Sequence, residues 1–219
     1  MKSKLILVVA AIAALSAGYW LSTQTQYSKQ DELLEARKNY SPIQGSVLSP
    51  PRKIAVPALT KDDGTTLTQA DLSGHWSLIF FGYMSCPDIC PVTMGVTATA
   101  KKLAASEGVD FPQVYFVSVD PERDAVESLA DYVQYFDKDF VGITGDEKLI
   151  QALTLQMSVV YMKMEATADD PNNYLVDHSS ALLLLNPEGR LVAFMNPPHD
   201  PKTIVKDFRI VKNLESQNL

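Results

Sequence analysis

Hydrophobic and polar positions along the chain predict that strands and helices alternate over most of its length. Two continuous apolar runs, Ser77–Phe81 and Gln113–Val119, have the length and composition of strands that are buried on both faces. Each run is followed by a helical pattern. One helix is expected after Pro91 and should stop near Gly108; the other is expected from Asp120, an N-cap residue type followed by a proline.

The remainder of the chain predicts shorter elements and a closing helix. They are a strand (Phe140–Ile143), a helix (Asp146–Leu155), two strands around a polar excursion (Ser158–Met164 and Tyr174–Val176), a hairpin (Ala181–Leu185 and Leu191–Met195) and a helix from Asp200 to about Leu214. This order predicts an α/β domain with a mixed central sheet flanked by helices. It is the order of elements that thioredoxin-like domains use.

The N-terminal segment has the layout of a membrane-targeting sequence. Lys2 and Lys4 precede an uncharged run at residues 5–21, which as a helix would span roughly 25 Å. A cleavable signal peptide is the alternative, with a possible cleavage site at Ala14–Ser16. We favour an uncleaved signal anchor, because the run continues past that site and ends in aromatic residues that suit a bilayer surface.

The expected organisation has four parts. Residues 1–4 are assigned to the cytoplasm, 5–21 to one transmembrane helix, 22–47 to a polar stem and 48–219 to a thioredoxin-like domain. Because the lysines stay inside, the domain is placed on the periplasmic or equivalent extracytoplasmic side of the cell inner membrane, as a single-pass protein. Such a compartment permits disulfide bonds.

Charge and cysteine content narrow the function. The net charge of −7 argues against a nucleic-acid partner, which would require a basic face. The chain has 2 cysteines, and both lie in the sequence Cys86-Pro-Asp-Ile-Cys90. A structural disulfide is one interpretation, but so short a loop would stabilise the fold by only about 2 kcal/mol in the loop-entropy model. A reactive pair is therefore the better hypothesis.

The position of these cysteines suggests their chemistry. They lie where a buried strand gives way to a helix N-terminus, a place where a thiol is expected to be exposed and its pKa lowered. The spacing is one residue longer than in the Cys-x-x-Cys redox motif, so Cys86 and Cys90 can form a redox disulfide or bind one metal ion as two thiolates.

A metal site would need a further ligand, and the chain has 3 histidines. His75 and His199 are in polar or proline-rich loops and are interpreted as surface residues. His178 precedes the strand at Ala181–Leu185, in a loop that faces the reactive thiols in thioredoxin-like folds. Two sulfurs with one imidazole suit Cu(I) and accommodate Cu(II), whereas structural zinc usually has four ligands.

Four motifs together resemble the Sco (SenC-type) family of copper chaperones for cytochrome c oxidase assembly. They are Phe-Phe-Gly-Tyr-Met-Ser-Cys-Pro-Asp-Ile-Cys-Pro, Ser-Val-Asp-Pro-Glu-Arg-Asp, Phe-Val-Gly-Ile-Thr-Gly and Tyr-Leu-Val-Asp-His-Ser. The resemblance implies a thioredoxin fold and one copper ion per chain, bound by Cys86, Cys90 and His178. It also implies that Asp120 matches an aspartate near the site, although its sequence context predicts an N-cap. Met84 stands where the family often has Thr, and we expect Met84 and Met94 to serve in packing.

Several functions are compatible with these residues. The first is a membrane-anchored metallochaperone for the copper-site subunit of a terminal oxidase, with other copper chaperones or thiol-disulfide reductases as further expected partners. The second is an extracytoplasmic thiol-disulfide reductase that acts on a client's cysteines, and the third is a redox or copper sensor. A peroxiredoxin-like peroxidase fits least well. Of the first two, only copper binding requires the imidazole of His178.

Overall fold

The computed structural model describes residues 16, 19–20, 42–165, 170 and 174–217. The chain divides into two compact units, residues 1–42 and 43–219. Ser16, Tyr19 and Trp20 are helical, but most of the predicted membrane anchor at residues 5–21 and of the predicted stem lies outside the described residues. Within the described residues, no helix has both the length and the apolar character needed to cross a membrane.

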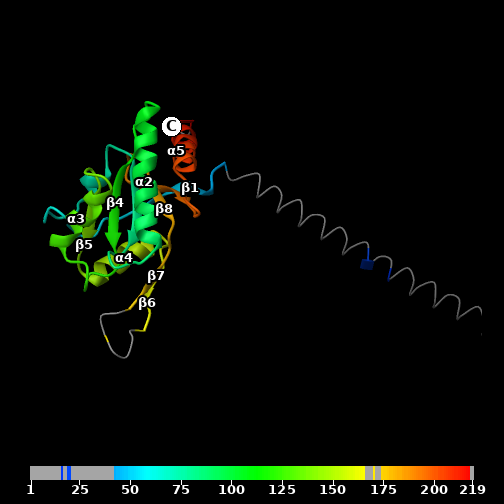
Figure 1. Ribbon diagram of the computed structural model, residues 1–219. Helices are drawn as coiled ribbons and strands as arrows, with labels where there is room; N and C mark the ends of the chain where they lie inside the picture. The colour runs from blue at the N-terminus through cyan, green and yellow to red at the C-terminus, as the bar shows by residue number, and fades with distance from the viewer. Residues whose placement is uncertain (1–15, 17–18, 21–41, 166–169, 171–173, 218–219) are drawn as a thin grey trace, which may run out of the picture. The chain divides into compact units, whose positions relative to one another are not determined.

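In the described part of the second unit, a mixed sheet of seven strands forms the centre of the fold (Figure 1). β3, β4 and β5 run parallel to one another, and the other neighbouring strands are antiparallel. All residues of β3 are buried, as its continuous apolar sequence predicts. The strand order is β1 (Gly45–Lys53), β9 (Arg190–Met195), β8 (Leu182–Leu185), β3 (Ser77–Gly82), β4 (Gln113–Ser118), β5 (Val141–Thr144) and β2 (Thr60–Lys61).

Four α-helices and one short 3₁₀-helix accompany this sheet in the described residues. They are η1 (Gln69–Leu72), α2 (Ile89–Ser106), α3 (Val126–Phe136), α4 (Glu147–Gln156) and α5 (Pro201–Gln217). α2 packs against both α5 and α3, and α3 also packs against β5. Gly108 follows α2 with a φ of +66°, so the predicted glycine stop is confirmed. The α/β plan with a mixed sheet is confirmed as well.

A separate pair of strands carries one of the predicted ligands. β6 (Tyr161–Lys163) and β7 (Val176–His178) form a two-stranded antiparallel sheet, in which Tyr161 is opposite His178. Figure 1 shows that this pair extends away from the main sheet, below α4 in the view. β6 is shorter than the strand predicted at Ser158–Met164, because its only paired neighbour in the described structure, β7, has three residues.

One expectation requires correction. The helix predicted from Asp120 is wrong at its start, because α3 begins at Val126 and residues 121–123 form a turn. The Asp120 side chain pairs with Arg123 instead of capping a helix. The second compact unit begins at Ile43, and β1 pairs with β9 from Gly45 onward.

Candidate metal and redox site

The sequence at the end of β3 places both thiols at one edge of the sheet. Cys86 lies in the loop after β3, and Cys90 lies in the first turn of α2, whose N-cap is Asp88. Gly82, the last residue of β3, leaves room for the second thiol. A Cβ atom at this position would lie 2.9 Å from the Cys90 Sγ and 2.8 Å from the Phe116 ring. A glycine in a strand often marks such a close approach.

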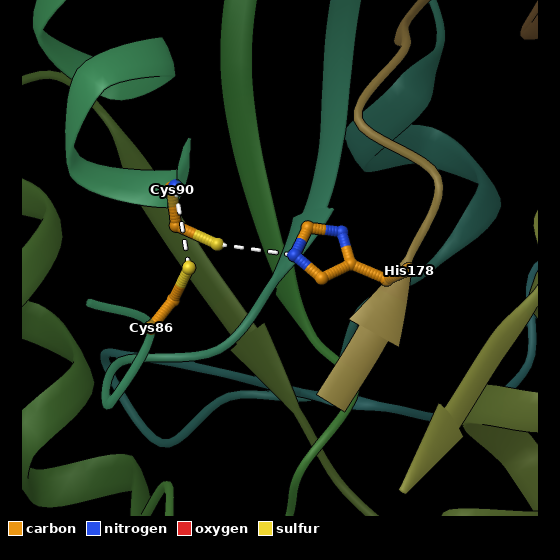
Figure 2. A group of neighbouring side chains, drawn as sticks. All are labelled: Cys86, Cys90 and His178. Carbon is orange, nitrogen blue, oxygen red and sulfur yellow. Dashed lines mark hydrogen bonds between the residues drawn. The ribbon is translucent and has the colours of Figure 1, made fainter. Parts of the chain in front are cut away.

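The structure brings the three predicted ligands together (Figure 2). Cys86 and Cys90 are free thiols. The Sγ atoms of both and a ring nitrogen of His178 all lie within 4.8 Å of one another. The Cys90 Sγ is 3.2 Å from the His178 Nε2, and the Cys90 backbone N–H donates to the Cys86 Sγ at 3.4 Å. The three side chains therefore converge on one point.

The orientation of His178 leaves one ring nitrogen available to the thiols. Its Nδ1 is 3.0 Å from the Ser179 carbonyl oxygen, which can only accept a hydrogen bond, so Nδ1 carries the proton. In the neutral ring, Nε2 then presents its lone pair toward Cys90. The rings of Phe80 and Tyr83 meet the imidazole edge-on, at centroid distances of 6.0 and 5.9 Å. These contacts fix the ring plane.

Burial determines the protonation of the site and corrects one expectation. Cys90 is fully buried, and this burial raises the pKa of its thiol despite its place near a helix N-terminus. The prediction of an exposed thiol with a lowered pKa is therefore wrong for Cys90. Burial also lowers the pKa of His178, which favours the neutral imidazole that a metal requires. Cys86 is 9% exposed and is the more accessible sulfur.

The donor set and its spacing fit a soft metal ion. Typical metal–sulfur and metal–nitrogen bonds of about 2.3 and 2.0 Å place two ligands of a three-coordinate ion about 4 Å apart. Here the Cys90 Sγ and His178 Nε2 are 3.2 Å apart and every pair of the three ligand atoms lies within 4.8 Å, a range that brackets that value. Two thiolates with one imidazole match the preferences of Cu(I), and the nitrogen also suits Cu(II). The same two sulfurs could instead join as a disulfide after a local movement of the loop.

The other candidate residues lie outside this cluster. His75 Nε2 is 3.3 Å from the Tyr115 hydroxyl, and His199 Nε2 is 2.8 Å from the Ser180 carbonyl oxygen. Both histidines are partly buried, so the interpretation as plain surface residues is wrong in that respect. Met94 is fully buried and Met84 packs against the core, which confirms their predicted packing roles.

Asp120 lies in a buried network beside the site rather than in the ligand cluster. Its carboxylate pairs with Arg123 and accepts a hydrogen bond of 2.7 Å from the Tyr174 hydroxyl. Asp124, four residues further on, is also buried and accepts a hydrogen bond of 2.9 Å from the Met84 backbone N–H. Sequence reasoning did not identify Arg123, Asp124 or Gly82. Gly82 is a glycine inside a strand pattern, and that signal could have indicated a close contact.

The SCO1/SenC family model matches residues 53–213, a range that contains β3, the cysteine loop and the hairpin with His178. The chain belongs to the SCO1/SenC family. A relative from Arabidopsis thaliana, the mitochondrial protein SCO1 homolog 1, is 38% identical over 157 residues, which are 69% of this chain and 46% of the relative. The mitochondrial SCO2 homolog of Bos taurus is 30% identical over 93% of this chain and 73% of its own length.

A solved structure confirms the thioredoxin-like fold of this SCO1/SenC member. The crystal structure of Arabidopsis thaliana ScoI with copper bound superposes with a TM-score of 0.64 at 34% identity. It covers 79% of this chain and 99% of that one. This chain spans less than half the length of the Arabidopsis SCO1 homolog 1, so the shared part is the folded domain rather than the whole relative.

Proposed function

We propose that this SCO1/SenC protein is a copper-binding metallochaperone with redox-active cysteines, and that it assists copper-centre assembly of cytochrome c oxidase. The observation that carries the proposal is the convergence of Cys86, Cys90 and His178 within 4.8 Å. The donor set matches copper in both oxidation states. Copper is the cargo, at one ion per chain, and the Arabidopsis structure that this chain resembles has copper bound.

Each ligand has a distinct task in holding the ion. The Cys90 thiol must lose its proton when the metal binds, so copper binding releases protons and weakens as the pH falls. The Nδ1–H of His178 is held by the Ser179 carbonyl, which keeps Nε2 directed at the sulfurs. Cys86 completes the set from the loop. When bound, copper supplies a charge that holds both sulfurs as thiolates.

The redox state of the cysteine pair gates copper loading. If an external disulfide accepts two electrons and two protons from Cys86 and Cys90 and becomes a dithiol, the pair joins in a disulfide and neither sulfur can bind copper as a thiolate. Reduction by an external dithiol restores both ligands. A thiol-disulfide reductase acting on a client's cysteines is the second candidate function, because both thiols are free and close together. A redox or copper sensor would use the same chemistry.

Copper titration of histidine variants tests the proposal. The full-length chain, reduced under anaerobic conditions, should bind one copper ion, and His178→Ala should weaken that binding by more than about 100-fold, since it removes a ligand. His199→Ala is the matched control, because His199 is also partly buried and bonded to a carbonyl, yet lies outside the cluster. A wild-type chain that binds no copper but rapidly reduces protein disulfides would support the reductase instead.

We further propose the cellular arrangement that the sequence predicts. Residues 1–4 lie in the cytoplasm, 5–21 anchor the chain in the inner membrane, 22–47 lead into the fold, and the domain faces the periplasm or an equivalent space. The client is the copper-site subunit of a terminal oxidase, and reductases or other copper chaperones supply electrons or metal. A fusion of alkaline phosphatase to the C-terminus should be active, since this enzyme requires disulfides formed outside the cytoplasm. An inactive fusion with a correctly folded domain would contradict this orientation.

A further inference from the structure

We infer that the turn Asp120–Asp124, called the acidic turn below, positions both halves of the copper site through two neighbouring side chains. Asp124 holds the loop that carries Cys86, and Arg123 holds the hairpin that carries His178. The inference rests on the proposed copper function, because it assigns positioning residues to that site. It also predicts that the two halves can be disturbed separately.

The acidic turn is itself well anchored. It begins two residues after the last residue of β4, and the backbone N–H groups of Arg123 and Asp124 donate to the Asp120 carbonyl at 3.1 and 3.0 Å. The exposed fractions of Asp120 and Asp124 are 0% and 1%. Buried carboxylates are rare unless polar groups satisfy them, because leaving water is unfavourable for a charge. The partners of these two aspartates therefore indicate what the turn is built to hold.

Asp124 holds the cysteine loop. Its Oδ2 accepts hydrogen bonds from the Met84 backbone N–H at 2.9 Å and from the Ser118 hydroxyl at 2.6 Å. Met84 lies two residues before Cys86, and the Cys86 backbone N–H donates to the Tyr83 carbonyl at 3.3 Å. The carboxylate thus connects the end of β4 to the backbone that presents the first thiol.

Arg123 holds the other half of the site. Its Nε pairs with the Asp120 carboxylate, and its Nη1 donates to the Tyr174 carbonyl at 2.9 Å. The guanidinium also lies 3.7 Å from the centroid of the Tyr174 ring, a close cation–π contact. The Tyr174 hydroxyl returns to Asp120 at 2.7 Å, so one arginine and one aspartate hold both ends of this tyrosine.

These contacts matter because the hairpin is not paired with the main sheet and contacts the domain through side chains, among them the buried Val176 and the His178 ring against Phe80 and Tyr83. β7, which ends at His178, pairs only with β6 in the described structure, and two strands alone are marginally stable in water. A second connection is the ion pair between Lys163 and Glu122, at 3.0 Å, whose partners are 27% and 64% exposed. An exposed pair of this kind is weak. Arg123, which is 16% exposed, is therefore the less exposed of these two polar connections between hairpin and domain.

The first experiment replaces Arg123 in the full-length chain. Arg123→Met should weaken Cu(II) binding about tenfold or more, in the range found for groups that orient metal ligands. It should change the nitrogen hyperfine pattern in the electron paramagnetic resonance spectrum of bound Cu(II). The Cys86–Cys90 reduction potential should change less than in the Asp124 variant described next. Arg123→Lys should recover little, because an ammonium cannot both stack and donate as a planar fork. Arg209→Met is the matched control, because Arg209 pairs with Glu107, away from the site.

The second experiment replaces Asp124. Asp124→Leu, which has no acceptor, should shift the Cys86–Cys90 reduction potential and weaken copper binding, whereas Asp124→Asn keeps one oxygen and should restore most of both. If Asp124→Leu fails to fold, hydrogen exchange of the wild-type Met84 amide provides the test. This amide should be strongly protected, and rapid exchange in the folded protein would overturn the assignment.

The outcomes separate this inference from the proposed function. If the wild-type chain binds no copper, the function fails, but the ¹⁵N chemical shifts of the apo His178 ring still report whether Arg123→Met displaces it relative to Arg209→Met. If the wild type binds copper and Arg123→Met keeps wild-type affinity, nitrogen couplings and His178 shifts, Arg123 has no positioning role. If Arg123→Met does not fold, Tyr174→Leu is used in its place, because it removes the same contact between the Arg123 guanidinium and the Tyr174 ring.

Discussion

The sulfur ligands and the imidazole ligand belong to regions that are built in different ways. The cysteines follow β3, which is buried throughout and hydrogen-bonded to β4 on one side and β8 on the other. His178 ends β7, a strand that pairs with β6 alone among the described residues. Strand pairing within the main sheet thus sets the sulfur positions, whereas the imidazole position depends on ring contacts with Phe80 and Tyr83 and on the polar contacts that hold its hairpin.

This difference separates stability from metal binding. A change at the end of β3 should affect the free energy of unfolding and the site together, because the same atoms serve both. A change at a half-buried or exposed position of β6 or β7 should affect the site more than global unfolding, because Val176 is the one buried residue of these two strands. Three predictions examine this comparison.

The largest effect is expected at Gly82. Gly82→Ala places a methyl group 2.9 Å from the Cys90 Sγ and 2.8 Å from Phe116, so the variant should lose about 1–3 kcal/mol of stability through overpacking and also bind copper less tightly. Denaturant unfolding and copper titration measure the two losses. Gly95→Ala in α2 is the control, since no atom lies within 4 Å of its added methyl group. Normal stability of Gly82→Ala would show that the end of β3 is not tightly packed.

An intermediate effect is expected on acid stability, through Asp71 on the main-sheet side. Its hydrogen bond with Lys61, at 2.7 Å, lowers the pKa of Asp71 from 3.8 to about 2. A carboxyl group whose pKa is lower in the folded than in the unfolded state stabilises the fold at pH values above its unfolded-state pKa. This contribution is lost as the pH falls through the folded-state pKa, so the free energy of unfolding should decrease by about 1–2 kcal/mol between pH ~4 and ~2. Lys61→Met should flatten this part of the curve of stability against pH. If the slope of stability against pH is the same in Lys61→Met as in the wild type, the Asp71–Lys61 pair is not the cause of the loss of stability in acid.

The smallest effect is expected at Lys163 on the hairpin. Lys163→Met removes the ion pair with Glu122 at 3.0 Å and the longer contacts with Glu147 at 3.7 Å and Asp120 at 4.0 Å. The free energy of unfolding should change by less than about 1 kcal/mol, because in the shortest pair Glu122 is 64% exposed. Copper affinity should change less than in Arg123→Met. If Lys163→Met instead weakens copper binding as much as Arg123→Met does, Lys163 and Arg123 contribute equally to holding the hairpin. The distinction drawn between these two residues would then be wrong.

The sequence predicted the features that depend on local patterns. The continuous apolar run of β3 predicted a buried strand, and the prolines and cysteines after it predicted a strand–helix junction with two thiols. His178 was identified because two thiolates need a further ligand, and the family resemblance supported this choice. In each case the signal lies within a few residues or in the chemistry of one residue type.

Features that depend on contacts between distant segments were not predicted. The sequence around Asp120 predicts an N-cap, but its carboxylate is occupied by Arg123 and by Tyr174, which is 54 positions away. No local pattern reveals that pairing. The pKa of Cys90 was missed for a related reason: the helix N-terminus is visible in the sequence, whereas the depth of burial depends on the whole fold. The role of Asp124 depends on Met84, 40 residues earlier.

The unequal exposure of the two sulfurs has a consequence for how copper would leave the site. Cys86 is 9% exposed and lies in a loop, whereas Cys90 is fully buried at the start of α2. Under the proposed function, an incoming ligand from a client would approach the ion on the Cys86 side and replace that sulfur first. Cys90 would then make the last bond to the departing ion. Transfer would follow an ordered series of ligand exchanges, with a direction set by which sulfur solvent can reach.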